Sequence, residues 1–140
     1  MPPAQANVPL LHRFLGFGLL AIATAAVAVK SLGVVSTPPQ GEFTRMLAYA
    51  FSGIATVMVV VAFLVLKPRV PERTPGQSVD VYWSTPAIVA KVMLVWFVLE
   101  GGAMMGVLGY FMTGEAVAAG AALFGIAAFL LCGPKVFAKE

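Results

Sequence analysis

One acidic residue, Glu100, stands inside an apolar run that extends from Val92 to Met112. A carboxyl group near the centre of a bilayer costs about 2.5 to 3.5 kcal/mol on insertion scales. Low-dielectric surroundings disfavour the ionised form, so we expect Glu100 to be protonated or hydrogen-bonded at neutral pH. Such an acid can exchange its proton for a cation, which is the chemistry of H⁺ and Na⁺ carriers. The same group can also be a structural hydrogen bond to another helix.

A second apolar run, from about Phe43 to Leu66, contains the polar residues that could face this acid. Tyr49, Ser52 and Thr56, together with Gly53, fall at helical spacings that place them on one face. That face is a candidate partner for Glu100 in a buried polar or ion-binding site. The alternative is ordinary helix packing through small residues.

The helix that carries Glu100 has two different faces. One face carries Gly102, Gly106 and Gly109, and its Gly-x-x-x-Gly spacing favours close contact with another helix. Glu100 lies on the other face among bulky apolar side chains. Lys91 is nine residues away, which places it on the opposite face, so an ion pair between Lys91 and Glu100 within this helix is excluded.

The run from Ala116 to Cys132 carries a stripe of small residues at steps of three and four. We expect this stripe to pack closely against another helix and Cys132 to pack with it. Its members are Ala118, Ala121, Gly125, Ala128 and Cys132.

Cofactor and metal chemistry has few possible ligands in this sequence. His12 is the only histidine and Cys132 the only cysteine, so one chain supplies neither bis-histidine haem ligation nor a multi-histidine metal site. The seven methionines form no Met-x-Met cluster, and we interpret them as packing residues. We therefore expect no metal and no cofactor.

The composition indicates that these residues are positioned by helices in lipid. Hydrophobic residues make up 60% of the 140 residues and charged residues 11%, which is too apolar for an ordinary soluble domain. The predicted fold is all-α, one domain over residues 1–140, in which four transmembrane helices form an antiparallel bundle. The predicted spans are residues 10–35, 43–66, 86–112 and 116–132. The first of them also resembles a signal peptide, with a small-residue site at Ala26-Val27-Ala28.

The connections follow from proline, glycine and charge. Residues 1–9 are expected to form a loose tail, and Thr37-Pro38-Pro39 a turn. Residues 67–85 contain several prolines, so we expect an irregular loop, with Tyr82-Trp83 in the aromatic belt at the bilayer surface. This basic loop is interpreted as a solvated connector, with binding of anionic lipid as the alternative.

The distribution of basic residues predicts the orientation. Six lie on the side that holds both termini and the long loop, and two, Lys30 and Arg45, lie on the other. By the positive-inside rule both termini face the cytoplasm of a bacterial-type inner membrane. The six are Arg13, Lys67, Arg69, Arg73, Lys135 and Lys139. Because the basic residues sit at helix ends and form no run, nucleic acid is not an expected partner.

The residues around Glu100 resemble the ion-binding helix of the proteolipid (c) subunits of rotary ATPases. In that helix a mid-membrane acid is followed by Ala, Gly and an apolar pair, as Glu100 is here by Ala103, Gly106 and Val107-Leu108. The resemblance covers residues 86–112 and implies a protonatable Glu100 at an oligomer surface. The glycine repeat of the partner helix is missing, and the chain as a whole resembles small bacterial four-helix membrane proteins with a Glu-Gly-Ala-like signature.

Two functions follow from these observations. In the first, the chain is a small subunit or accessory protein of a membrane complex that docks through its Gly and Ala faces. In the second, it handles H⁺ or Na⁺ through Glu100 as a homo-oligomer. We expect no enzyme, because the sequence contains no metal cluster, no nucleophile with its base and no phosphate-binding loop. The expected partners are membrane lipids and other membrane subunits or further copies of the chain.

Overall fold

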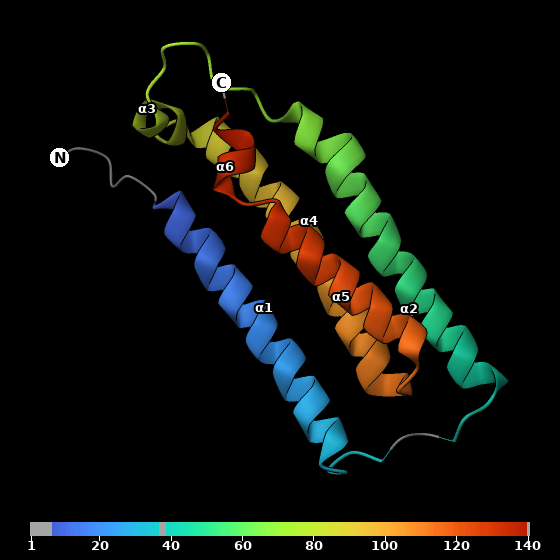
Figure 1. Ribbon diagram of the computed structural model, residues 1–140. Coiled ribbons are helices and arrows are strands. Elements are labelled where there is room, and N and C mark those ends of the chain that lie inside the picture. Colours follow the sequence, from blue (N-terminus) through green and yellow to red (C-terminus); the bar gives the residue numbers. More distant parts are fainter. Residues whose placement is uncertain (1–6, 37–38, 140) are drawn as a thin grey trace.

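The structure, a computed structural model, describes residues 7–36 and 39–139, and every regular element among them is a helix. Figure 1 shows four long helices side by side, with short helices gathered at one end. The elements are α1 (Val8–Ser31), α2 (Glu42–Val61), the π-helix η1 (Ala62–Leu66), the 3₁₀-helix η2 (Lys67–Arg69), α3 (Val79–Trp83), α4 (Pro86–Thr113), α5 (Ala116–Leu131) and α6 (Pro134–Phe137).

Local capping residues set where these helices begin and end. The side chain of Asn7 accepts a hydrogen bond from the backbone N–H of Leu10 and starts α1. Pro86 occupies the first turn of α4, where its missing N–H costs nothing. Gly114 ends α4 with a left-handed φ of 72° and donates its N–H to the carbonyl of Tyr110 at 2.7 Å.

Helix α4 is the central element of the bundle. It packs most extensively against α5, next against α2 and then against α1. Helices α1 and α4 run in one direction and α2 and α5 in the other, with α1 and α2 on opposite sides of the α4–α5 pair (Figure 1). The core therefore lies along α4, where Val92, Val95, Trp96, Leu99 and Ala103 are fully buried.

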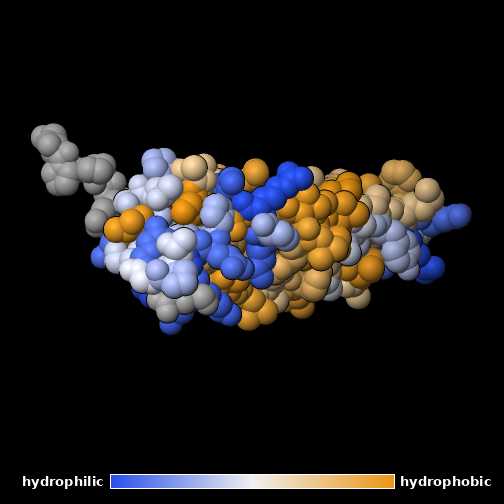
Figure 2. Space-filling view, turned by 90° about the horizontal axis from the view of Figure 1, so that it is seen from above, coloured by the Kyte–Doolittle hydropathy of each residue, from blue (hydrophilic) through white to orange (hydrophobic). Residues whose placement is uncertain are grey.

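The outside of the bundle is apolar. In the most hydrophobic 18-residue windows of α1 and α2, only 11% and 22% of the residues are buried, although these windows contain almost no charge. In Figure 2 a broad band of hydrophobic residues separates hydrophilic residues near the two ends of the visible face. In water so large an exposed apolar surface would be unstable, so lipid is the solvent that this fold requires. The chain is a membrane protein.

The helix lengths confirm three of the predicted spans by length and composition. Helices α1 and α4 and the continuous segment Glu42–Arg69 are each long and apolar enough to cross a bilayer. Helix α5 is apolar but has only 16 residues, about 24 Å at 1.5 Å per residue, so it is shorter than a typical span. The first span ends at Ser31 and not near Val35, because Gly33 turns the chain with a φ of 69°.

The long polar connection differs from the prediction. It contains α3, which Ser78 caps by accepting a hydrogen bond from the N–H of Val81. Tyr82 is fully buried and Trp83 is 9% exposed; their predicted place in the aromatic belt at the bilayer surface stays a prediction. Both rings pack within the protein, edge to face with centroids 4.8 Å apart. Of the expected tail and first turn, residues 1–6 and 37–38 lie outside the described residues.

Candidate functional site

Glu100 lies halfway along α4, 14 residues after Pro86 or about 21 Å along the helix axis. It is half-buried, and its flanking residues define the side that it faces. Trp96, one turn earlier on the same side, contacts His12 of α1 with ring centroids 4.7 Å apart. The backbone carbonyl of Phe111, three turns later, accepts a hydrogen bond from the Nζ of Lys30 in α1 at 2.9 Å. Glu100 therefore faces the side of α4 along which α1 packs.

Within the part of the chain that the structure describes, no hydrogen bond or ion pair holds the Glu100 carboxyl group. Lys91 is exposed, and nine residues of helix place it on the opposite face of α4 from Glu100. The carboxyl group thus sits at the middle of an apolar helix with its hydrogen-bonding capacity unused.

The polar face of α2 is not brought to Glu100. Ser52 donates its hydroxyl to the carbonyl of Ala48 at 2.8 Å, and Thr56 donates to the carbonyl of Ser52 at 2.8 Å. Tyr49 is 64% exposed and points away from the bundle interior. Because both hydroxyls bind their own helix, the prediction that this face supplies partners to the acid is wrong.

The position of α2 around α4 gives the geometric reason. A Cβ on Gly102 would lie 3.1 Å from the carbonyl oxygen of Ala55 and 3.2 Å from the Cβ of Met58, so Gly102 faces α2. Two residues along a helix correspond to about 200° of rotation. Glu100 and Gly102 therefore face opposite directions, and α2 lies behind α4 as seen from the acid.

The predicted packing glycines lie at close helix contacts. A Cβ on Gly106 would approach the Cα of Ala122 to 2.6 Å, and a Cβ on Gly125 would approach the Cα of Ala103 to 2.6 Å. Gly109 meets Phe51 of α2 and Ala118 of α5. Since backbone atoms occupy the space of the missing side chains, α4 and α5 are as close as they are only because these positions are glycine.

These contacts change the interpretation of the small-residue faces. Ala118, Gly125 and Ala128 are buried inside the chain, Ala121 is half-buried, and Ala122 beside it is 7% exposed. The Gly and Ala faces of α4 and α5 join helices of this chain to one another. The predicted docking of another subunit through these faces stays a prediction, and the structure shows them in contacts within the chain.

A buried aromatic cluster around His12 could not be predicted from the sequence. His12 is 7% exposed, and its ring stacks on Phe129 with an interplanar angle of 6°. His12 Nε2 lies 3.1 Å from the carbonyl oxygen of Phe129, and Trp96 donates Nε1–H to the carbonyl of Cys132 at 2.7 Å. Side chains of α1 and α4 thus satisfy carbonyl groups at the end of α5.

A second side-chain contact holds the other end of α1 against α4. Lys30 donates to the carbonyl of Phe111, near the end of α4, and its ammonium lies 5.6 Å from the ring centroid of Tyr110. A lysine near a helix C-terminus is favoured by the helix dipole as well as by the hydrogen bond. The lone histidine and one lysine therefore fix α1 to the rest of the bundle.

Among residues 7–36 and 39–139, no group of three or more His, Cys, Asp or Glu side chains is placed to hold a metal ion. Cys132 is buried and packs at the end of α5 as expected. Glu100 is the mid-helix acid whose carboxyl group has no hydrogen-bond or ion-pair partner among the described residues.

Comparison with known proteins adds no family assignment. No protein-family model, curated protein or solved structure matches this chain. The resemblance of residues 86–112 to the proteolipid helix remains a prediction.

Proposed function

We propose that this chain is a four-span integral subunit or accessory protein of a larger complex in a bacterial-type inner membrane. In this proposal both termini and the long loop face the cytoplasm, and α5 crosses the membrane as the short fourth span. Glu100 forms a hydrogen bond or ion pair with another subunit of the complex.

The observation that carries this proposal is the unpartnered carboxyl group of Glu100. It lies midway along α4 and forms no hydrogen bond or ion pair with any residue in the described ranges. A polar group in hydrocarbon is costly without a partner, even when it is neutral. A donor from outside the chain would remove that cost, which favours an assembly over an isolated protein.

The exposed helix surfaces support a docking role for α1. Its outward face is apolar, with small residues at positions that leave room for another helix: Gly18, Ala21 and Ala25 are exposed, and nothing lies within 4 Å of a Cβ at Gly18. The inner Gly and Ala contacts of α4 and α5 are already occupied.

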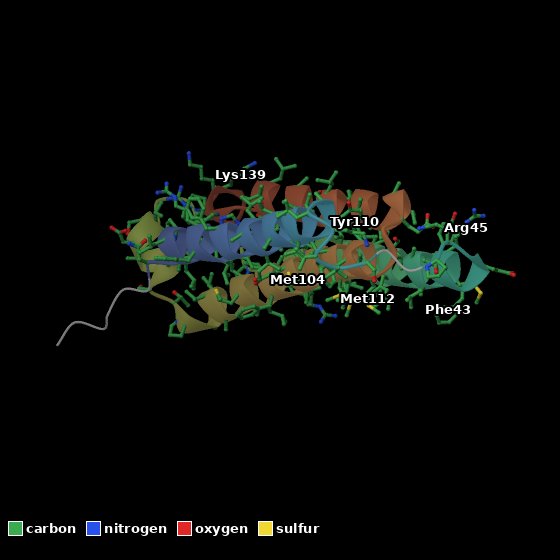
Figure 3. All side chains as sticks on the ribbon, turned by 90° about the horizontal axis from the view of Figure 1, so that it is seen from below. Phe43, Arg45, Met104, Tyr110, Met112 and Lys139 are labelled. Carbon is green, nitrogen blue, oxygen red and sulfur yellow. The ribbon has the colours of Figure 1, made fainter. Side chains whose placement is uncertain are left out.

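Charge distribution supports the proposed orientation. The start of α1, the end of α2, the long loop and α6 all lie at one end of the bundle (Figure 1), and that end holds Lys67, Arg69 and Lys135. In Figure 3, Lys139 lies toward this end and Arg45 lies at the opposite end. Lysine and arginine concentrate on the cytoplasmic side of membrane proteins.

The second candidate function is uptake of H⁺ or Na⁺ by Glu100 in a homo-oligomer. The free carboxyl group favours it, but the surroundings favour a proton over a sodium ion. A hard cation needs several oxygen ligands, and the hydroxyls of Ser52 and Thr56 bind their own helix on α2, behind α4. For this reason the subunit proposal takes precedence.

Purification of a tagged chain tests the proposal. Wild-type protein, Glu100→Ala and the control Glu115→Ala would be extracted in a mild detergent, and the chains bound to each would be identified and their stoichiometry measured. We expect wild type and Glu115→Ala to carry other membrane chains at a fixed ratio, and Glu100→Ala to lose them while it remains folded. A chain that purifies only as rings of itself, or partners that Glu100→Ala retains in full, would overturn the proposal.

A further inference from the structure

A pocket of about 530 Å³ lies where the end of α2, the following loop and α6 meet. Its volume is within the range of roughly 300 to 1,000 Å³ that is typical of small-molecule sites. We call it the loop-end pocket, and it is lined by Phe63, Lys67, Pro68, Val70, Pro71, Glu72, Val136 and Phe137. It lies at the opposite end of α4 from the Lys30 contact and plays no part in the proposal for Glu100.

The pocket contains a positioned and unneutralised cation. The ammonium of Lys67 lies 5.4 Å from the ring centroid of Phe63, a cation–π contact that holds it at the pocket wall. Within the described residues Lys67 forms no ion pair, not even with Glu72 across the same pocket. Its charge is therefore available to an anion.

The backbone around Lys67 departs from a regular α-helix, and this segment forms one wall of the loop-end pocket. Pro68 cannot donate a backbone hydrogen bond, and its ring would collide with the preceding turn of a regular α-helix. The chain responds by widening into the π-helix Ala62–Leu66 and then tightening into the 3₁₀ turn Lys67–Arg69. Such π segments are frequent at functional sites, and this one carries Phe63 four residues before Lys67.

Hydrogen bonds hold the remaining walls in place. Tyr82 donates its hydroxyl to the carbonyl of Pro71 at 2.8 Å, and burial raises the pKa of its phenol above the ordinary value of 10.0, so it remains a donor. Arg73 donates to the carbonyl of Ala138 at 3.1 Å, which joins the loop to the end of α6. The pocket is thus formed by contacts of the chain itself.

The location of the pocket indicates the source of the anion. Leu64 and Val65, in the turn before Lys67, are exposed apolar side chains at the end of the lipid-facing surface of α2. Arg69, two residues after Lys67, and Lys135, next to the lining residue Val136, are exposed and add positive charge at this end. A molecule with a negative head and apolar chains matches a cationic pocket directly beyond such a surface.

We propose that the loop-end pocket binds the phosphate-bearing headgroup of an anionic phospholipid, with Lys67 as the ligand of the phosphate. The acyl chains lie along the exposed side chains of α2. Val70, Val136 and Phe137 provide an apolar wall for the glycerol region, and Glu72 at the rim disfavours excess negative charge.

Native mass spectrometry of the full chain in detergent tests this proposal. The protein would be titrated with phosphatidylglycerol, with neutral phosphatidylcholine and with glycerol phosphate as a free phosphate source. We expect phosphatidylglycerol to bind at least about tenfold more tightly than the other two, because the cationic choline of phosphatidylcholine is repelled by the positive charge at this end and glycerol phosphate has no acyl chains to bury. Equal retention of phosphatidylcholine, or equally tight binding of glycerol phosphate, would overturn the lipid assignment.

Three variants separate the pocket from the general surface charge. Lys67→Gln should weaken phosphatidylglycerol binding about tenfold, whereas the control Lys91→Gln removes an exposed charge elsewhere at the same end of the bundle and should change it by about twofold or less. Glu72→Gln should strengthen binding, and Val136→Trp should weaken it by filling the pocket without a change of charge. Equal effects of Lys67→Gln and Lys91→Gln would mean diffuse attraction and would contradict a site.

Discussion

At the scale of single residues, Glu100 and His12 show how differently two ionisable side chains can be placed in one bundle. His12 is enclosed between Trp96 and Phe129 and has a backbone partner, the carbonyl of Phe129. Glu100, one turn beyond Trp96, has no partner in the described part of the chain. The histidine therefore contributes to this chain's own packing, whereas the proposed function gives Glu100 a partner in another subunit.

The hydrogen bond from Trp96 to Cys132 should make a measurable contribution to stability. Trp96→Phe removes the donor and leaves a buried carbonyl without its partner, so we expect a loss of about 1 to 3 kcal/mol in the free energy of unfolding. Trp83→Phe is the matched control, because Trp83 forms no hydrogen bond within the described residues and the lost volume is the same. Unfolding in detergent followed by circular dichroism measures both; equal losses would show that packing alone matters.

The sequence predicts part of this residue-scale picture. Isolation of Glu100 in an apolar run is visible directly, and helical geometry alone excludes Lys91 as its partner. The role of His12 is not visible, because it depends on the carbonyl of Phe129, 117 residues away in the sequence. Spacing gave no reason to bring these two residues together.

At the scale of elements, glycine determines how closely α4 approaches its neighbours. Gly106 and Gly125 place backbone against backbone between α4 and α5, whereas Gly53 and Gly120 face open space. The same residue type thus has opposite consequences at different positions. A glycine is needed for close helix packing only where its position is buried against another helix, so the number of glycines in a helix does not predict the contact.

Alanine substitutions should separate these two kinds of glycine. Gly106→Ala forces a methyl group into the backbone of Ala122 and should destabilise the bundle by about 1 to 3 kcal/mol. Gly120→Ala meets nothing and should be neutral or stabilise by about 0.5 to 1 kcal/mol through helix propensity. Thermal unfolding in detergent is the measurement, and an unchanged midpoint for Gly106→Ala would contradict the close α4–α5 contact.

Helix α1 packs against the bundle over its first half, where Val8, His12, Gly16 and Leu19 are buried. Beyond Leu19, an apolar groove of about 200 Å³ separates it from α4 and α5, lined by Ala23, Ala26, Val107, Tyr110 and Ile126 among others. Few apolar contacts mean low local stability. The Lys30 contact should therefore matter more to α1 than a single hydrogen bond would to a tightly packed helix.

Removal of that lysine should loosen the end of α1. Lys30→Met deletes the hydrogen bond to Phe111 and the contact with Tyr110, and we expect faster backbone hydrogen exchange over residues 24–31. Lys91→Met removes an exposed lysine and should leave exchange in α1 unchanged. Equal exchange in wild type and Lys30→Met would contradict the role of Lys30.

Element boundaries were predictable where proline or glycine interrupts an apolar run. Pro86 and Gly114 bracket α4 within one residue of the predicted limits, and α2 begins one residue before its predicted start. Helix α3 was missed because the prolines around it, from Pro68 to Pro86, favour irregular structure. Its five residues are stabilised by burial of Tyr82 and Trp83, which is a tertiary effect.

At the scale of the whole molecule, an apolar belt and unequal charge at the two ends define how the bundle can sit in lipid. Three helices are long and apolar enough to span, and the shorter α5 packs against the central helix (Figure 1). In the proposed orientation, with four crossings and the basic end inside, both termini and the loop-end pocket would lie at the cytoplasmic surface.

Reporter fusions test this orientation. We expect a fluorescent protein fused after Lys139 to fold and fluoresce in the cytoplasm, and a cysteine at Ser36, between α1 and α2, to react with an impermeant maleimide added outside the cell. Substitution of the buried Cys132 by Ser removes the native thiol from the second assay. A cysteine at Ser36 that reacts only after the cells are broken would reverse the orientation.

The central claim is that the partner of Glu100 lies outside this chain, and reaction with a hydrophobic carbodiimide tests it most directly. Mass spectrometry would compare modification of Glu100 with that of Glu115, as an internal reference, in native membranes and in the purified chain in detergent. We predict that Glu100 is protected in the membrane and is modified at least several-fold faster once the chain is isolated. Equal modification in both preparations, promoted by protons and suppressed by Na⁺, would contradict the account and identify Glu100 as an open ion-binding group. Absence of modification in both would place its partner within the chain and contradict the account as well.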